Sequence, residues 1–126
     1  MRTIMRVAIG LVGLFNIILG LGFLLVPDKL ALAFFLAPTN VQGLATLRAD
    51  FTGFFIGAAI FALLGAWRAD PRPLLVPLVM LGLALFGRTV SLFVDGVGPE
   101  AIEPMVIEVV MLVLLLAARR TFAAKP

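Results

Sequence analysis

Seven polar side chains lie within or at the ends of long apolar stretches of this sequence. They are Asn16, Arg48, Asp50, Arg88, Ser91, Asp95 and Glu108. Arg88 is the most unusual, because it lies inside the apolar stretch 74–96, and a charge at the centre of a membrane helix costs about 2.5–3.5 kcal/mol. A carboxylate on a neighbouring helix is therefore expected beside it. Glu108 is the ionisable residue that the last apolar stretch offers, so the sequence predicts an Arg88–Glu108 ion pair, with Asp50 as a further partner of Arg88.

The spacing of these residues predicts that they share one depth in a set of packed helices. A helix rises 1.5 Å per residue, so Arg88 lies about 21 Å into its stretch and Asn16 about 18 Å into the first one. Arg88, Ser91 and Asp95 recur at i, i+3 and i+7, and therefore follow one helix face. The other three stand near the starts of the second and fourth stretches, so we expect all seven to form one polar cluster.

Carboxylates outnumber guanidinium groups in this predicted cluster, by three to two. One carboxylate must then be protonated, solvated or matched by a cation that the chain does not supply. Glu108 is the best candidate for protonation, because it enters its helix deepest. Three interpretations stay open: an ion-pair network that fixes helix register, a binding site for a ligand or lipid head group, and a proton-transfer site.

The composition indicates a membrane protein and excludes several kinds of site. Hydrophobic residues make up 63% and charged residues 13% of the 126 residues, and the mean hydropathy of +1.19 lies outside the range of soluble globular chains. The chain has no Cys and no His, so it lacks thiolate and imidazole ligands, and we expect neither metal nor cofactor. The pI of about 10.7 comes from positive charges beside apolar stretches, which set membrane orientation, so nucleic-acid binding is excluded.

The hydrophobic pattern predicts an all-α membrane fold with a single domain over residues 1–126. The expected architecture is an up-down bundle of four transmembrane helices, at about residues 4–26, 44–67, 73–95 and 101–118. The first apolar run is longer than the core of a signal peptide, so we expect it to be retained as a helix.

Two further segments are expected outside the spans. Residues 30–37 are too short to cross a membrane, and either form an interfacial helix anchored by Phe34 and Phe35 or continue the first helix around a bend. After the last helix, the tail from Thr121 to Pro126 is short and polar enough to be frayed.

Positive residues gather at one end of the predicted bundle. This end carries Arg2, Arg6, Arg68, Arg72, Arg119, Arg120 and Lys125, opposed only by Asp70. At the other end Lys29 stands among Asp28, Asp95, Glu100 and Glu103. Because cytoplasmic segments carry the excess of Lys and Arg, we expect both termini in the cytoplasm of a bacterium and the chain in its inner membrane.

Small residues predict where helices approach one another closely. Gly53 with Gly57, Gly87 with Ser91, and a stripe of Gly13, Asn16 and Gly20 have the spacing that such contacts require. A chain of this size also leaves much helix surface facing lipid, so a homodimer is expected.

Several of these residues resemble a known family pattern. The matching residues are Leu47-Arg48 followed by Phe51 and Gly53, Gly87-Arg88 with Ser91-Leu92 and Asp95-Gly96, and Glu108 in the last helix. The pattern is similar to a family of small bacterial four-helix membrane proteins, catalogued as a domain of unknown function. It also looks distantly like the four-helix membrane subunits of the DoxX type that work with quinone-linked oxidoreductases. Both resemblances imply a fold, and neither implies an activity.

The leading functional interpretation is a non-enzymatic binding or accessory protein. Its charged pocket in the outer leaflet is expected to receive the head of a membrane lipid, a quinone or another amphiphile, between walls formed by Phe51, Phe54, Phe86 and Phe93. One alternative is an intramembrane lipid-modifying enzyme that uses Glu108 or Asp50 as its acid-base group, although no His, Cys, Tyr or nucleophile-elbow Ser supports it. The other alternative is a subunit of a membrane complex in which the ion pairs are purely structural.

Overall fold

The computed structural model describes residues 1–124, and these are largely helical with no strand among them. The helices are α1 (Arg2–Leu25), α2 (Pro27–Ala33), α3 (Val41–Thr46), α4 (Thr52–Arg68), α5 (Leu75–Val94) and α6 (Ile102–Ala123), and a π-helical turn, η1 (Leu47–Phe51), joins α3 to α4. The predicted all-α fold is confirmed. Three segments, namely α1, the continuous helix Val41–Arg68 and α5, are long and apolar enough to cross a membrane.

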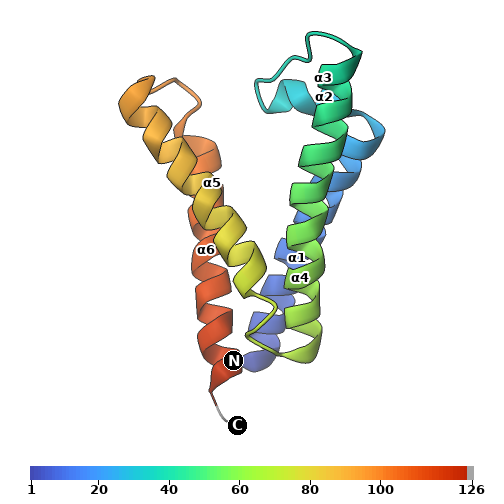
Figure 1. Cartoon of the computed structure of the whole chain (residues 1–126). Coiled ribbons are helices and arrows are strands. Elements are labelled where there is room, and N and C mark those ends of the chain that lie inside the picture. The colour runs from blue at the N-terminus through green and yellow to red at the C-terminus, as the bar shows by residue number, and fades with distance from the viewer. Residues whose placement is uncertain (125–126) are drawn as a thin grey trace.

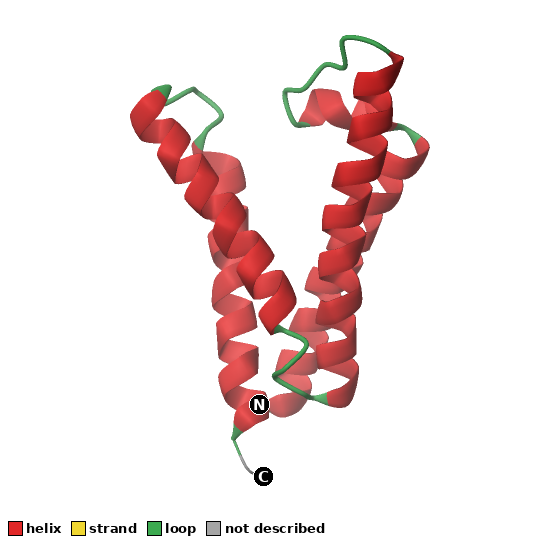
Figure 2. Ribbon diagram, in the orientation of Figure 1, coloured by secondary structure: helices red, strands yellow, loops and turns green. Residues whose placement is uncertain are grey.

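The four long helices form two pairs that diverge from a common end. α1 packs along α4, and α5 packs against α6. Figure 1 shows the pairs close together where the N-terminus and the last turns of α6 lie, which we call the closed end. They are separated where α2 and α3 lie, which we call the open end, and Figure 2 shows the loops that follow α2 and α5 at that end. The fold is therefore a wedge of two helical hairpins.

Two hydrophobic cores correspond to these two ends. The larger core takes residues from all four long helices toward the closed end; it consists of Ile9, Val12, Ala62, Ala66, Leu74, Leu81, Met111, Leu115, Ala118 and Phe122. The smaller core lies nearer the open end and consists of Phe23, Ala31, Leu47 and Phe55. Because its members come from α1, α2, η1 and α4, this second core holds one pair together without contributions from α5 or α6.

Glycines let α1 approach α4 closely. A Cβ atom at Gly13 would lie 2.6 Å from Cγ of Leu63, and one at Gly20 would clash with the side chain of Ile56. Both glycines are therefore required by the spacing of the two helices, as the stripe in the first helix predicted.

The other predicted glycine contacts do not form within residues 1–124. A Cβ atom at Gly53, Gly57 or Gly87 would meet nothing within 4 Å. The expectation that these glycines bring two helices of the bundle together is wrong, because the pairs diverge and no helix faces them closely. Whether Gly53 and Gly57 contact a second copy of the chain stays a prediction.

Three arginines fasten the closed end by donating hydrogen bonds to backbone carbonyl oxygens. Arg6 reaches Ala66 (2.9 Å) and Trp67 (3.0 Å), Arg2 reaches Ala69 (3.4 Å) and Ala124 (3.3 Å), and Arg119 reaches Pro71 (3.2 Å). Most of these acceptors lie at the end of α4 and in the turn after it, where a helix leaves carbonyl groups unpaired and partially negative. The guanidinium groups thus tie α1 and α6 to the turn between α4 and α5.

A separate short helix, α2, follows α1. The chain leaves α1 at Val26, with φ −136° and ψ 58°, and restarts with Pro27 in the first turn of α2, where the missing N–H of proline costs nothing. Beyond α2, the ring of Phe34 packs edge-on against that of Phe23, with 5.2 Å between centroids. Phe34 is therefore half-buried against the smaller core, whereas Phe35 is 73% exposed; their role as interfacial anchors stays a prediction.

The last helix is longer than expected. α6 continues past Ala118 to Ala123, because Phe122 is buried in the larger core and Arg119 is bonded to the turn after α4. The expectation of a frayed tail from Thr121 is wrong up to Ala123, and its last two residues, Lys125 and Pro126, lie outside the described residues.

Candidate functional site

A cavity of about 560 Å³ lies between the two helix pairs. It is lined from α1, from Ala33 to Phe35 at the end of α2, from η1 and α4, and from α5 and α6 with the turn between them. Its aromatic lining consists of Phe15, Phe34, Phe35, Phe51, Phe54 and Phe55. The volume falls within the range of about 300–1,000 Å³ that is typical of small-molecule sites.

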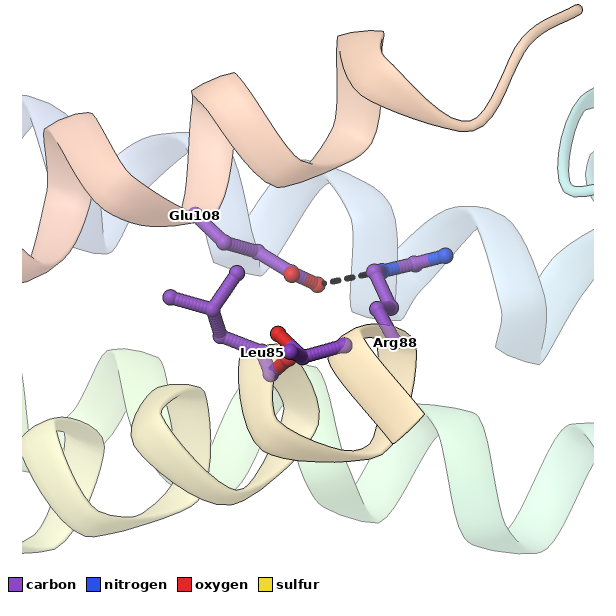
Figure 3. Close-up of polar contacts among 4 residues, drawn as sticks. Leu85, Arg88 and Glu108 are labelled. Atoms are coloured by element: carbon purple, nitrogen blue, oxygen red, sulfur yellow. Dashed lines mark hydrogen bonds and ion pairs between the residues drawn. The ribbon is translucent and has the colours of Figure 1, made fainter. Parts of the chain in front are cut away.

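Arg88 and Glu108 form an ion pair on the wall of this cavity. Nε of Arg88 donates to Oε1 of Glu108 over 2.9 Å, and Figure 3 shows the two side chains reaching toward each other from α5 and α6. The predicted pair is confirmed, and it is the one ion pair within residues 1–124. The side chain of Glu108 is 11% exposed and that of Arg88 is 40% exposed. The carboxylate is therefore far more dependent on its partner than the guanidinium group is.

The second carboxylate oxygen of Glu108 is left without a partner. Oε2 is buried and accepts no hydrogen bond from the described part of the chain. Buried polar atoms are nearly always hydrogen-bonded in native proteins, so this oxygen calls for a donor that the described residues do not supply.

Asn16 lies beside the cavity rather than in its lining. Its side-chain amide donates to the carbonyl oxygen of Val12 (2.8 Å) and to the sulfur of Met111 (3.7 Å). Met111 lines the cavity three residues after Glu108, so Asn16 is placed against α6 next to the ion pair. Its Oδ1 atom is a second buried acceptor that lacks a partner among the described residues.

Asp50 and Arg48 do not share a site, although the sequence predicts both in one polar cluster. Asp50 lines the cavity but makes no ion pair with Arg88, because Glu108 is the one carboxylate that Arg88 contacts in the described chain. Arg48 does not line the cavity, and it donates from Nε to the carbonyl oxygen of Leu24 at the end of α1 (2.9 Å). Two residues that are two apart on a helix face different sides, so equal depth did not bring them together.

Ser91 and Asp95 also lie outside the main cavity. Ser91 lines a second hollow of about 340 Å³ between α5 and the start of α6, which it shares with Arg88. Asp95 is exposed at the C-terminal end of α5 and lines neither hollow. The predicted stripe on this helix therefore contributes Arg88 alone to the main cavity.

The lining contains residues that the sequence did not assign to it. Glu100 and Glu103, in the turn before α6 and in its first helical turn, join Asp50 and Glu108 around the cavity. The expected walls Phe86 and Phe93 are 67% and 87% exposed and do not line it. The signal that could have found them is position, because both glutamates lie within eight residues before Glu108, in the turn and the first helical turn that lead to it.

The cavity combines a largely apolar surface with several charged side chains. A long aromatic and aliphatic surface can hold an apolar chain, and charged residues reach the cavity from η1 in one pair and from α5, α6 and the turn between them in the other. Residues 1–124 hold no group of three or more His, Cys, Asp or Glu side chains that could bind a metal ion. The lining therefore offers ion pairing and hydrogen bonding from its charged side chains beside an apolar surface.

Comparison with known proteins gives a family without an assigned activity. No curated protein and no solved structure matches the chain. A family model described as a domain of unknown function, DUF4345, matches residues 4–119, which carry the cavity, the Arg88–Glu108 pair and most of each of the four long helices. The chain belongs to this DUF4345 family.

Proposed function

We propose that this protein is a membrane-embedded binding protein whose cavity receives an amphiphile such as a lipid or a quinone. The observation that carries the proposal is the cavity of about 560 Å³, with a largely apolar lining and an ion pair on its wall. A purely structural ion pair would be expected in a tightly packed interface. Here the pair borders open space, and one of its oxygen atoms has no partner in the described chain.

The proposal includes four membrane spans with both termini in the cytoplasm of a bacterium. α6 has 22 residues, a length of about 33 Å at 1.5 Å per residue, which matches a bilayer core. Its one charge well inside that length, Glu108, is answered by Arg88. The closed end carries the arginines Arg2, Arg6 and Arg119, so the positive-inside rule favours a cytoplasmic closed end. The open end and the cavity then face the outer leaflet.

An amphiphile fits this orientation because the two pairs diverge toward the open end. Its tail would lie among the aromatic side chains of α1 and α4, and its head beside the acidic residues and Arg88. In this proposal α2 and Phe35 lie at the membrane interface and cover one side of the entrance. A role as an accessory subunit that presents a bound lipid or quinone to a larger complex is compatible with this activity, and so is a homodimer.

Filling the cavity tests the proposal. Ala84 lies on α5 and lines the cavity, so Ala84→Trp should occupy its space. The matched control is Val79→Trp, because Val79 is half exposed on the same helix and lines neither hollow. Native mass spectrometry of protein gently extracted from membranes should show a retained amphiphile in the wild type and in the control, and a strong loss of it in Ala84→Trp. A wild-type protein that retains no lipid or quinone, and gains no thermal stability when either is added, would refute a ligand site.

A further inference from the structure

The charges that line the cavity are strongly unbalanced. Four carboxylates surround it, namely Asp50, Glu100, Glu103 and Glu108, against a single guanidinium group, that of Arg88. Arg88 is already paired with Glu108, and this is the only ion pair within residues 1–124. The other three carboxylates are therefore exposed to the cavity and its mouth without a cation from the described chain.

The cavity itself supplies an independent sign of a missing donor. Glu108 lines the same space, and its buried Oε2 atom has no hydrogen-bond partner in the described residues. A group that donates hydrogen bonds and carries positive charge would satisfy this oxygen and offset the acidic lining. An anionic group would face four carboxylates, of which Glu108 is buried and the other three lie at exposed positions, and their like charge would repel it.

We propose that the head group of the bound amphiphile carries a protonated primary amine. This inference rests on the proposed binding function and narrows its ligand class. An ammonium group donates three hydrogen bonds and accepts none, which matches a surface of carboxylate acceptors. A neutral quinone head, which only accepts hydrogen bonds, would use Arg88 alone and leave the three unpaired carboxylates, Asp50, Glu100 and Glu103, without a role.

Arg88 adds a second element of recognition. Its contact with Glu108 uses Nε, and its side chain is 40% exposed, so the two terminal nitrogen atoms can donate to a phosphate. A head group with a phosphate next to an ammonium group, as in an ethanolamine phospholipid, would place each charge against its opposite. A single-chain amine would contact the carboxylates only. The two candidate ligands, an ethanolamine phospholipid and a single-chain amine, therefore share the ammonium group, but only the phospholipid needs Arg88.

The test compares head groups on an identical acyl chain. Purified full-length protein in a neutral detergent is offered lysophosphatidylethanolamine and lysophosphatidylglycerol in equal amounts, and the bound fraction of each is measured by native mass spectrometry. We expect the ethanolamine form to be retained at least about tenfold more, because like charges placed together are strongly disfavoured. Dodecylamine is then added as a competitor: displacement of the lipid identifies a single-chain amine as sufficient, and retention of the lipid identifies the phospholipid head group as the preferred source.

Paired variants separate the acidic lining from general charge. Glu100→Gln with Glu103→Gln removes two carboxylates from exposed positions that line the cavity, so folding should be unaffected. Asp28→Asn with Asp95→Asn changes the overall charge equally, at exposed positions outside the cavity. The first double variant should lower the preference for ethanolamine to less than about threefold, and the second should leave it unchanged. Equal retention of the two lipids by the wild type, or equal effects of the two double variants, would overturn the proposal of an amine head group, although the proposed binding function would stand. Retention of neither lipid would count against the amine head group and against the proposed binding function.

Discussion

Replacing Arg88 with leucine removes the one cation that contacts Glu108 in the described chain, and leaves a buried carboxylate with no partner for either oxygen atom. Removing one member of a buried ion pair costs about 3–5 kcal/mol when the remaining charge stays buried. Because the Glu108 side chain is only 11% exposed, we expect Arg88→Leu to lower the free energy of unfolding by about 3 kcal/mol, the lower end of that range.

The reverse substitution should cost less. The Arg88 side chain is 40% exposed, and a long side chain can move its charged end toward a polar surface when its partner is removed. Its unpaired charge is therefore partly solvated, so we expect Glu108→Leu to cost about 1 kcal/mol. The double variant carries no charge at either position and should also lose about 1 kcal/mol, which corresponds to a coupling energy of about 3 kcal/mol.

Unfolding by a denaturing detergent, followed by far-UV circular dichroism, measures these differences, because the fold is helical and its single tryptophan, Trp67, is exposed. Asp95→Leu is the control, since it removes an exposed charge outside both hollows and should change stability by less than about 0.5 kcal/mol. Losses for Arg88→Leu and Glu108→Leu that add to within about 0.5 kcal/mol in the double variant would show that the residues are not energetically coupled. A larger loss for Glu108→Leu than for Arg88→Leu would refute the argument from burial.

Two further substitutions test the packing of the helices and the turn after α4. Gly13→Ala places a Cβ atom against Leu63 and should destabilise the protein by about 1–3 kcal/mol. Its control is Gly10→Ala, where a Cβ would meet nothing within 4 Å, and this change should be neutral or stabilising by up to about 1 kcal/mol. Equal effects of the two changes in the same unfolding assay would contradict the close approach of α1 to α4. Ala69 ends α4 with a φ of 49°, in the left-handed region that glycine adopts at lower cost than alanine. Ala69→Gly should therefore raise the free energy of unfolding by about 1 kcal/mol. A loss of stability would mean that this conformation carries no strain.

The depth of each residue along its helix could be predicted from the sequence, because a helix advances by a fixed rise per residue. Arg88 and Glu108 were predicted as partners from their positions within two apolar stretches, and they pair in the structure. The same reasoning failed for Arg48, which has the depth of Asp50 but faces the opposite side of its helix and bonds to the end of α1. A shared depth says nothing about direction around the helix axis, and that direction is fixed only when helices pack.

The aromatic lining shows the same limit. Phe51 and Phe54 were correctly expected at the site, but Phe86 and Phe93 are exposed, and Phe34 and Phe35 take part in the lining instead. Phe34 reaches the cavity because the chain breaks after α1 and α2 runs in a new direction. Residues 30–37 are apolar in any of these arrangements, so hydrophobicity could not distinguish an interfacial anchor from a cavity wall.

The sequence by itself determined the helical, membrane-like character of the chain and the need for a partner to Arg88, because hydrophobic length and an unanswered charge are properties of the chain alone. Only the tertiary structure decided that the helices diverge as two pairs, and the cavity exists because they diverge. The physical reason is that divergence depends on which faces pack: the close contacts of Gly13 and Gly20 join α1 to α4, while the larger core joins all four helices only toward the closed end. Glu100 and Glu103 come to line a site with Asp50 as a result of that divergence, and no spacing along the chain encodes it.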